Sequence, residues 1–140
     1  MTCSGSPQQD HILAIDDEAG FLTFLKVALE CEGYRVHLAT SPNEAITFYR
    51  ERWRDIRVVI LDYLMPQMSG DVVFDELQRS NPDVRVVLLT TCDESTAEKL
   101  FHKGLCGYLQ KPFDLQDLAQ KVRDAIHAPG TAAAASPAPV

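Results

Sequence analysis

Four short, mostly apolar runs, each followed directly by a polar residue, constrain the fold of this chain more than any other feature. The runs occupy residues 12–15, 58–61, 84–89 and 108–110. The polar residues that follow them are Asp16, Asp17, Asp62, Thr90 and Lys111. Short β-branched runs with polar boundaries are typical of buried parallel strands. Because ligands bind at the carboxyl ends of such strands, we expect these five side chains to meet at one edge of a sheet.

Helical patterns separate the runs, and residues 35–38 add a fifth short strand. The helix boundaries are predicted from capping, glycine and proline residues, namely Gly33, Ser41, Pro82, Ser95 and Asp114. The last helix is expected to turn Leu115, Leu118, Val122 and Ile126 toward the core. Five alternations of strand and helix predict an α/β fold with a parallel sheet covered on both faces and right-handed crossovers. A strand order of 2-1-3-4-5 would place the carboxylates at its switch point.

The composition describes one globular domain and excludes several function classes. The chain has 140 residues, 46% of them hydrophobic, and a formal net charge of -7. An acidic chain without a basic stretch is a poor nucleic-acid binder, and no apolar run is long enough to span a bilayer. Residues 1–10 lack the pattern of a secretory signal. The four cysteines, which show no C-x-x-C spacing, indicate reduced thiols of a cytoplasmic protein; they are Cys3, Cys31, Cys92 and Cys106.

Composition shifts divide the chain into three segments. Residues 1–10 are predicted to be a flexible leader, residues 11–127 the compact domain, and residues 128–140 a linker or tail rich in alanine and proline. Thirteen residues after His127 are too few for an output domain. We therefore expect either a stand-alone domain or one that belongs to a longer protein.

The polar residues at the predicted edge suit phosphoryl chemistry. Mg²⁺ is bound by one or two carboxylates together with waters and phosphate oxygens, and Asp16, Asp17 and Asp62 supply such carboxylates. The hydroxyl of Thr90 and the ammonium of Lys111 could contact a phosphoryl group. Taken alone, Asp16 and Asp17 fit equally well as acids that stabilise a helix N-terminus.

The set of motifs resembles the receiver domain of two-component response regulators over about residues 11–127. The matching motifs are Asp16-Asp17, the run Asp62-Tyr63-Leu64-Met65-Pro66 with Ser69-Gly70, the strand end at Thr90, and the run Tyr108-Leu109-Gln110-Lys111-Pro112-Phe113. The resemblance implies a flavodoxin-like, doubly wound (βα)5 fold with five parallel strands. Within the family, the run Met65-Pro66-Gln67-Met68-Ser69-Gly70 and the run that starts at Tyr108 look most like receivers attached to hybrid histidine kinases.

The resemblance also implies a role for each matched residue. Asp62 matches the phosphoacceptor, and Lys111 matches the lysine that pairs first with the acceptor and then with the phosphate. Asp17 matches a direct Mg²⁺ ligand, and Asp16 matches one acting mainly through water. The remaining matches are the backbone carbonyl of Leu64 as the third protein ligand, Thr90 as the switch hydroxyl, Tyr108 as the aromatic that changes rotamer, and Pro112 as the residue after a cis bond.

Two departures from the family pattern affect the switch region. Thr91 stands where the family has a very small residue, and Thr90 is preferred as the switch hydroxyl because it closes the apolar run at the family's usual distance from Asp62. The segment from Thr90 to Lys111 is also slightly short, so we expect a trimmed fourth helix or preceding loop.

Leu64, apolar and branched, is expected to exclude water and so to slow the loss of phosphate.

The leading function is a phosphorylation-controlled signalling module rather than an enzyme with a general substrate. The expected partners are a sensor histidine kinase or histidine phosphotransfer protein, an unknown output partner or domain, and a second copy in a phosphorylation-dependent dimer. The output could be a DNA-binding or a cyclic-nucleotide domain. An aspartyl-phosphate phosphatase would need a second aspartate at the position of Leu64. A pseudo-receiver that acts only as an interaction domain is opposed by the complete set of site residues.

Overall fold

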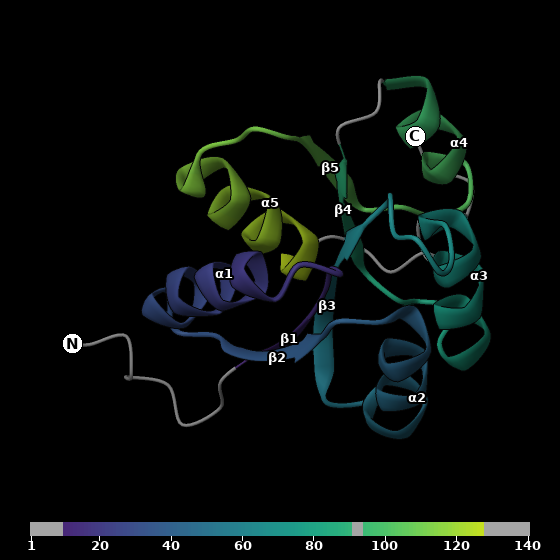
Figure 1. Ribbon diagram of the computed structural model, residues 1–140, viewed down its shortest axis with the longest axis horizontal. Helices are drawn as coiled ribbons and strands as arrows, with labels where there is room; N and C mark the ends of the chain where they lie inside the picture. The colour runs from purple at the N-terminus through teal and green to yellow at the C-terminus, as the bar shows by residue number, and fades with distance from the viewer. Residues whose placement is uncertain (1–9, 91–93, 128–140) are drawn as a thin grey trace.

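The structure, a computed structural model, describes residues 10–90 and 94–127 (Figure 1). The strands are β1 (His11–Ile15), β2 (Arg35–Ala39), β3 (Ile56–Asp62), β4 (Val86–Thr90) and β5 (Gly107–Gln110). The helices are α1 (Ala19–Cys31), α2 (Pro42–Arg52), α3 (Gly70–Ser80), α4 (Glu94–Phe101) and α5 (Leu115–His127). Residues 1–9 of the expected leader, the expected tail, Thr91, Cys92 and the side chain of Ser95 lie outside the described residues.

All strands of the sheet run parallel in the order β2-β1-β3-β4-β5, which confirms the predicted fold class and topology. The chain moves outward from β1 to β2, then returns to the other side of β1 with β3. The topological switch point therefore lies between β1 and β3. Within the described residues, the longest helices have 13 residues, and none is apolar enough over a sufficient length to cross a membrane.

Local chemistry explains where the helices begin and end. The Ser41 hydroxyl accepts a hydrogen bond from the Glu44 N–H at 3.2 Å, and the Glu44 carboxylate accepts one from the Thr40 N–H at 3.1 Å. The first bond confirms Ser41 as the predicted N-cap of α2, while the second reaches the residue before the N-cap and not the N-cap N–H of a regular capping box. After α1, Gly33 adopts a φ of 103°, a conformation that glycine takes without steric cost.

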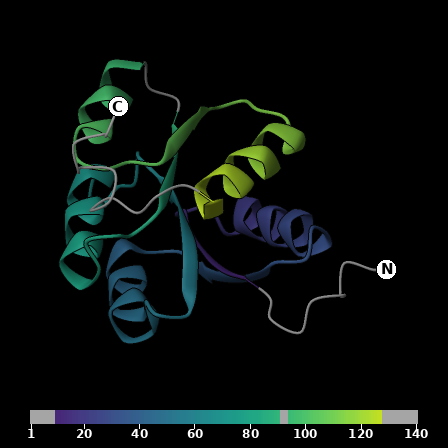
Figure 2. The same cartoon turned by 180° about the vertical axis from the view of Figure 1, so that it is seen from behind.

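Two layers of helices cover the sheet, α1 and α5 on one face and α2, α3 and α4 on the other (Figures 1 and 2). Under α1 and α5 the core contains Leu22, Leu25, Leu29, Leu118 and Val122 together with alternate strand residues. The opposite core contains Tyr49, Phe74, Leu77, Leu100 and Leu105. The expectation that Leu115 faces the core under α1 and α5 is wrong, because its side chain is 41% exposed at the first residue of α5.

Arg85 joins the amino end of β4 to the end of the last helix. Its Nη1 donates a hydrogen bond of 2.9 Å to the carbonyl oxygen of Ile126, one of the final carbonyls of α5. Such carbonyls lack a partner within the helix, so a cation at this position stabilises the helix end. The Nε of Arg85 is buried and has no hydrogen-bond partner among the described residues.

Candidate functional site

The carboxyl edge of the sheet brings together the residues that the sequence pattern selects. Asp62 and Thr90 are the last residues of β3 and β4, while Asp16 and Lys111 directly follow β1 and β5. The strand ladder continues into these positions: the N–H of Asp16 donates to the Ala39 carbonyl at 3.2 Å, and the N–H of Lys111 donates to the Thr90 carbonyl at 2.8 Å. The backbone therefore holds the site residues in register on rigid elements.

Three carboxylates converge at the switch point. Asp16, Asp17 and Asp62 each offer an oxygen atom within 4.8 Å of the others. Asp16 and Asp62 are buried, whereas Asp17 is exposed. One oxygen of Asp16 accepts a hydrogen bond of 2.9 Å from the N–H of Glu18, which fixes the turn into α1. These oxygen donors fit a hard divalent cation such as Mg²⁺, because such ions prefer carboxylates and complete their shell with water.

Lys111 is the cation that the structure places among these carboxylates. Its Nζ lies 3.4 Å from Oδ2 of Asp16 and 3.5 Å from Oδ1 of Asp62. The peptide bond between Lys111 and Pro112 is cis, as the family resemblance implied. The ammonium also lies 4.7 Å from the centre of the Phe21 ring. Sequence reasoning placed Phe21 only on a helix face, and no spacing rule connects it with Lys111.

The electrostatics of the site disfavour a full set of negative charges. Burial, followed by the neighbouring charge of Asp16, raises the pKa of Asp62 to about 6, against opposing contributions from Lys111 and the Leu64 N–H. Burial also raises the pKa of Asp16, although the Glu18 N–H and Lys111 act in the opposite direction. One ammonium therefore compensates the buried carboxylates only in part. An added cation would relieve this imbalance.

The residues expected to switch lie on one side of the sheet. Thr90 is fully buried, and β4 pairs Leu88 with Tyr108 and Thr90 with Gln110. Thr90, two residues after Leu88, points to the same face as Leu88, which packs in the core beside Tyr108. Tyr108 is partly buried and meets the ring of Phe101 on α4 edge to face, with centroids 6.1 Å apart. The structure thus links the strand end at Thr90 to α4.

The loop after β3 folds closely over the start of α3. The N–H of Gly70 donates to the carbonyl of Tyr63 at 2.9 Å, and a Cβ at position 70 would lie 2.8 Å from the Cα of Tyr63. Only glycine allows this approach without a shift of the backbone. Leu64, inside the same loop, has a side chain that is 53% exposed.

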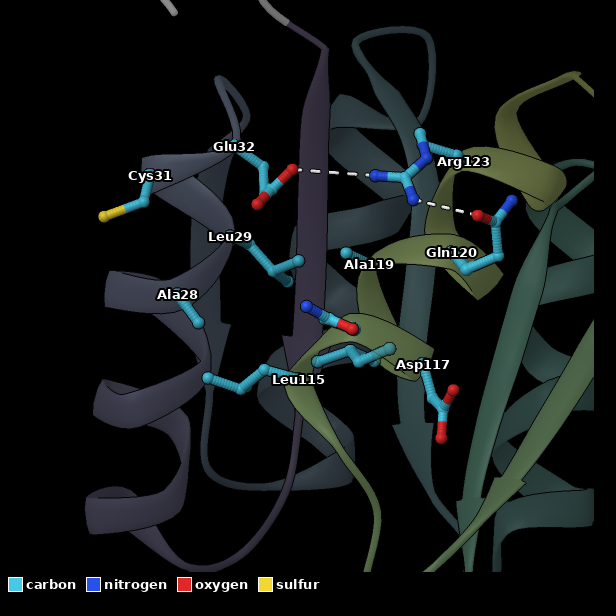
Figure 3. Close-up of a pocket in the computed structure, with 11 residues that line it drawn as sticks. Ala28, Leu29, Cys31, Glu32, Leu115, Asp117, Ala119, Gln120 and Arg123 are labelled. Carbon is cyan, nitrogen blue, oxygen red and sulfur yellow. Dashed lines mark hydrogen bonds and ion pairs between the residues drawn. The ribbon is translucent and has the colours of Figure 1, made fainter.

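A separate groove of about 690 Å³ lies between α1 and α5 (Figure 3). Arg123 crosses one end of it, with Nη1 3.6 Å from a carboxylate oxygen of Glu32 and Nη2 donating to Gln120 at 2.9 Å. The groove contains none of the three carboxylates, Thr90 or Lys111. It is therefore distinct from the candidate site.

Comparisons with known proteins agree with this geometry. The family model of the response regulator receiver domain matches residues 12–123. The chain is 31% identical over 114 residues to the sensor kinase CckA of Brucella abortus, covering 81% of this chain and 12% of the relative. It is 32% identical over 123 residues to the probable transcriptional regulator ycf27 of Porphyra purpurea, covering 85% and 48%. The chain thus spans about half, or much less, of these relatives.

A solved structure is similar over nearly its whole length. The crystal structure of a response regulator receiver domain protein from Clostridium thermocellum is 36% identical, with a TM-score of 0.80. The match covers 84% of this chain and 94% of the other.

Proposed function

The chain belongs to the receiver-domain family of response regulators, and from that premise we propose that it accepts a phosphoryl group on Asp62 from a phosphohistidine. The observation that carries this proposal is the position of the Lys111 ammonium, 3.4 Å from Asp16 and 3.5 Å from Asp62, at an edge where three carboxylates converge. A buried aspartate beside a flexible cation suits a nucleophile whose product carries more negative charge.

The transfer is a substitution at phosphorus. A carboxylate oxygen of Asp62 forms the new O–P bond while the P–N bond of the phosphohistidine breaks. The electron pair of the broken bond stays on the imidazole nitrogen, which takes up a proton to leave a neutral histidine. Lys111, already within reach of Asp62, then pairs with the oxygens of the resulting acyl phosphate.

We propose Mg²⁺ as the cofactor of this transfer. Asp17 and Asp62, with the backbone carbonyl of Leu64, would hold the ion, and Asp16 would act mainly through water. When bound, the ion offsets the charge of the transferring phosphoryl group. The carboxylate oxygens within 4.8 Å of one another and the raised pKa of Asp62 support this assignment.

We propose that the phosphoryl group changes the surface formed by α4, β5 and α5. The Thr90 hydroxyl would move toward the phosphoryl oxygens, and Tyr108 would turn into the space beside it. The edge-to-face contact between Tyr108 and Phe101 supports this coupling, because a rotation of Tyr108 changes the packing of α4. A second copy of the chain could use the altered surface in a phosphorylation-dependent dimer.

The proposed role is that of a cytoplasmic signalling domain and not of an enzyme with a general substrate. Its donor would be a sensor histidine kinase or a histidine phosphotransfer protein. Similarity to a sensor kinase as well as to a transcriptional regulator leaves the output open, since the chain spans only part of both relatives. A phosphatase of the aspartyl-phosphate type is less well supported, because Leu64 occupies the position of its second aspartate.

Labelling with acetyl phosphate and Mg²⁺, read by intact mass, tests the proposal. The wild type should gain one phosphoryl group, and Asp62→Asn should lose labelling completely while keeping its fold. Asp55→Asn, which alters an exposed aspartate at the opposite edge, is the matched control and should label like the wild type. Full labelling of Asp62→Asn would overturn the assignment, and continuous turnover of acetyl phosphate with no labelled species would favour the phosphatase.

A further inference from the structure

The Lys111 ammonium has an aromatic contact that the proposed chemistry does not use. Its Nζ lies 4.7 Å from the centre of the Phe21 ring, within the range of a cation–π interaction. Phe21 stands in the first turn of α1, five residues after Asp16. The ammonium is therefore surrounded by Asp16, Asp62 and the ring.

A lysine in this position needs such a third contact. Its two carboxylate distances, 3.4 and 3.5 Å, are long for charge-assisted hydrogen bonds. The side chain is 26% exposed and ends a flexible four-carbon stem, so water competes for the ammonium. Without another attractive surface, the ammonium would spend time away from Asp62.

We propose that Phe21 is a positioning residue that holds the Lys111 ammonium against Asp62. The inference rests on the proposed function, because it assigns a role within the same site. The face of the ring attracts the cation and adds no negative charge to a site whose carboxylates already repel one another. The ring also offers no lone pair that competes with phosphoryl oxygens for the ammonium.

Two neighbouring rings contact Phe21, and one of them provides a matched control. Phe113, two residues after Lys111, meets Phe21 edge to face with centroids 6.2 Å apart. Phe24, one turn further along α1, stacks on Phe21 at 6.4 Å and is 48% exposed. Among the described residues, the cation–π contact of Lys111 is with Phe21 and not with Phe24, which makes Phe24 the matched control.

The first test measures the rate of labelling of Asp62 by acetyl phosphate. Phe21→Leu keeps an apolar side chain without a ring and should label about fivefold more slowly. Phe21→Tyr, which restores the ring face, and Phe24→Leu should both label within about twofold of the wild type. Equal rates for Phe21→Leu and the wild type would overturn the positioning role. If the wild type does not label, the proposed function is overturned, and the second test alone decides whether Phe21 and Lys111 are coupled.

The second test is a double-mutant cycle on the free energy of unfolding without metal or phosphodonor. Lys111→Met removes the charge and keeps most of the stem. Phe21→Leu should reduce the folding equilibrium constant about threefold more in the wild type than in the Lys111→Met background. The same cycle with Phe24→Leu should show no such coupling. A Phe21–Lys111 coupling no larger than the Phe24 control would mean that Phe21 only packs, and would overturn the inference.

Discussion

The two edges of the sheet use the same residue types in opposite ways. At the carboxyl edge, Asp16 and Asp62 are 3% and 6% exposed and share Lys111 at 3.4 and 3.5 Å. At the amino edge, Arg52 lies 3.2 Å from Asp55, and both side chains are about half exposed. The Asp55 carboxylate can be hydrated and has its own cation, whereas the buried Asp16 and Asp62 have neither advantage.

Substitutions at the amino edge should therefore change stability little, whereas the buried carboxylates at the carboxyl edge lower the stability of the folded chain. Exposed ion pairs contribute little to stability, because water screens them. Buried carboxylates with partial compensation cost stability, and such groups cluster at functional sites. The carboxyl edge is thus less stable than its packing would allow, a cost that the proposed binding of a cation and a phosphoryl group would offset.

The largest expected effect is on the pH dependence of stability. The pKa of Asp62 rises from 3.8 to about 6 on folding, so its contribution to stability is complete below pH 3.8 and is lost as pH rises through 6. Asp62→Asn should therefore unfold like the wild type near pH 4. At pH 7 without Mg²⁺ it should be more stable by on the order of 2–3 kcal/mol. Urea unfolding across this range checks the prediction, and a difference that stays constant with pH would contradict it.

A somewhat smaller effect is expected from Mg²⁺ at neutral pH. At ten times its dissociation constant, an ion that binds only the folded chain stabilises it by about 1.4 kcal/mol. Melting temperatures across a Mg²⁺ titration should rise for the wild type. Asp17→Ala removes an exposed carboxylate that is proposed as a metal ligand, so it should leave the metal-free protein nearly unchanged and abolish the rise. If the melting temperature of the wild type does not change with Mg²⁺, the carboxylates at the carboxyl edge do not differ from the exposed pair at the amino edge in their response to a cation.

Leu64 should set the lifetime of the phosphorylated state. Its side chain belongs to the loop between β3 and α3, can neither orient nor deprotonate water, and is 53% exposed. Leu64→Asn and Leu64→Glu should speed the loss of phosphate about three- to tenfold, equivalent to about 1 kcal/mol. The decay of intact mass after removal of the donor measures this rate. If both variants decay like the wild type, the lifetime is set by another group.

The smallest effect is expected at the amino edge. Asp55→Asn breaks the exposed pair with Arg52 and should change the free energy of unfolding by less than about 0.5 kcal/mol. The measurement is the same urea titration used for Asp62→Asn. A loss above about 1 kcal/mol would show that surface pairs matter here as much as the buried site.

Strand order and the convergence of Asp16, Asp62 and Lys111 could be predicted because they follow from chain topology. Apolar runs separated by helices fix a parallel sheet, and the residue after each strand then falls at one edge. The roles of the individual residues came from the family resemblance and remain predictions.

Contacts between distant side chains could not be predicted in this way. Histidines that share no sequence spacing, His11 and His37, lie 2.9 Å apart between Nδ1 and Nε2, because β1 and β2 are neighbours. The ring of Phe21 meets Lys111, and Leu115 faces outward although its spacing suits the core. Such details depend on rotamers and on the angle at which a helix crosses the sheet, which periodicity does not encode.

The bond between Arg85 and Ile126 has a mechanical consequence. Arg85 precedes the first residue of β4, and Thr90 is the last residue of the same strand. Because of this bond, the last turn of α5 is fastened to the amino end of the strand that ends at Thr90, in addition to the packing of α5 on the sheet. Removal of the Arg85 guanidinium would release that fastening and leave the packed face of α5 in place.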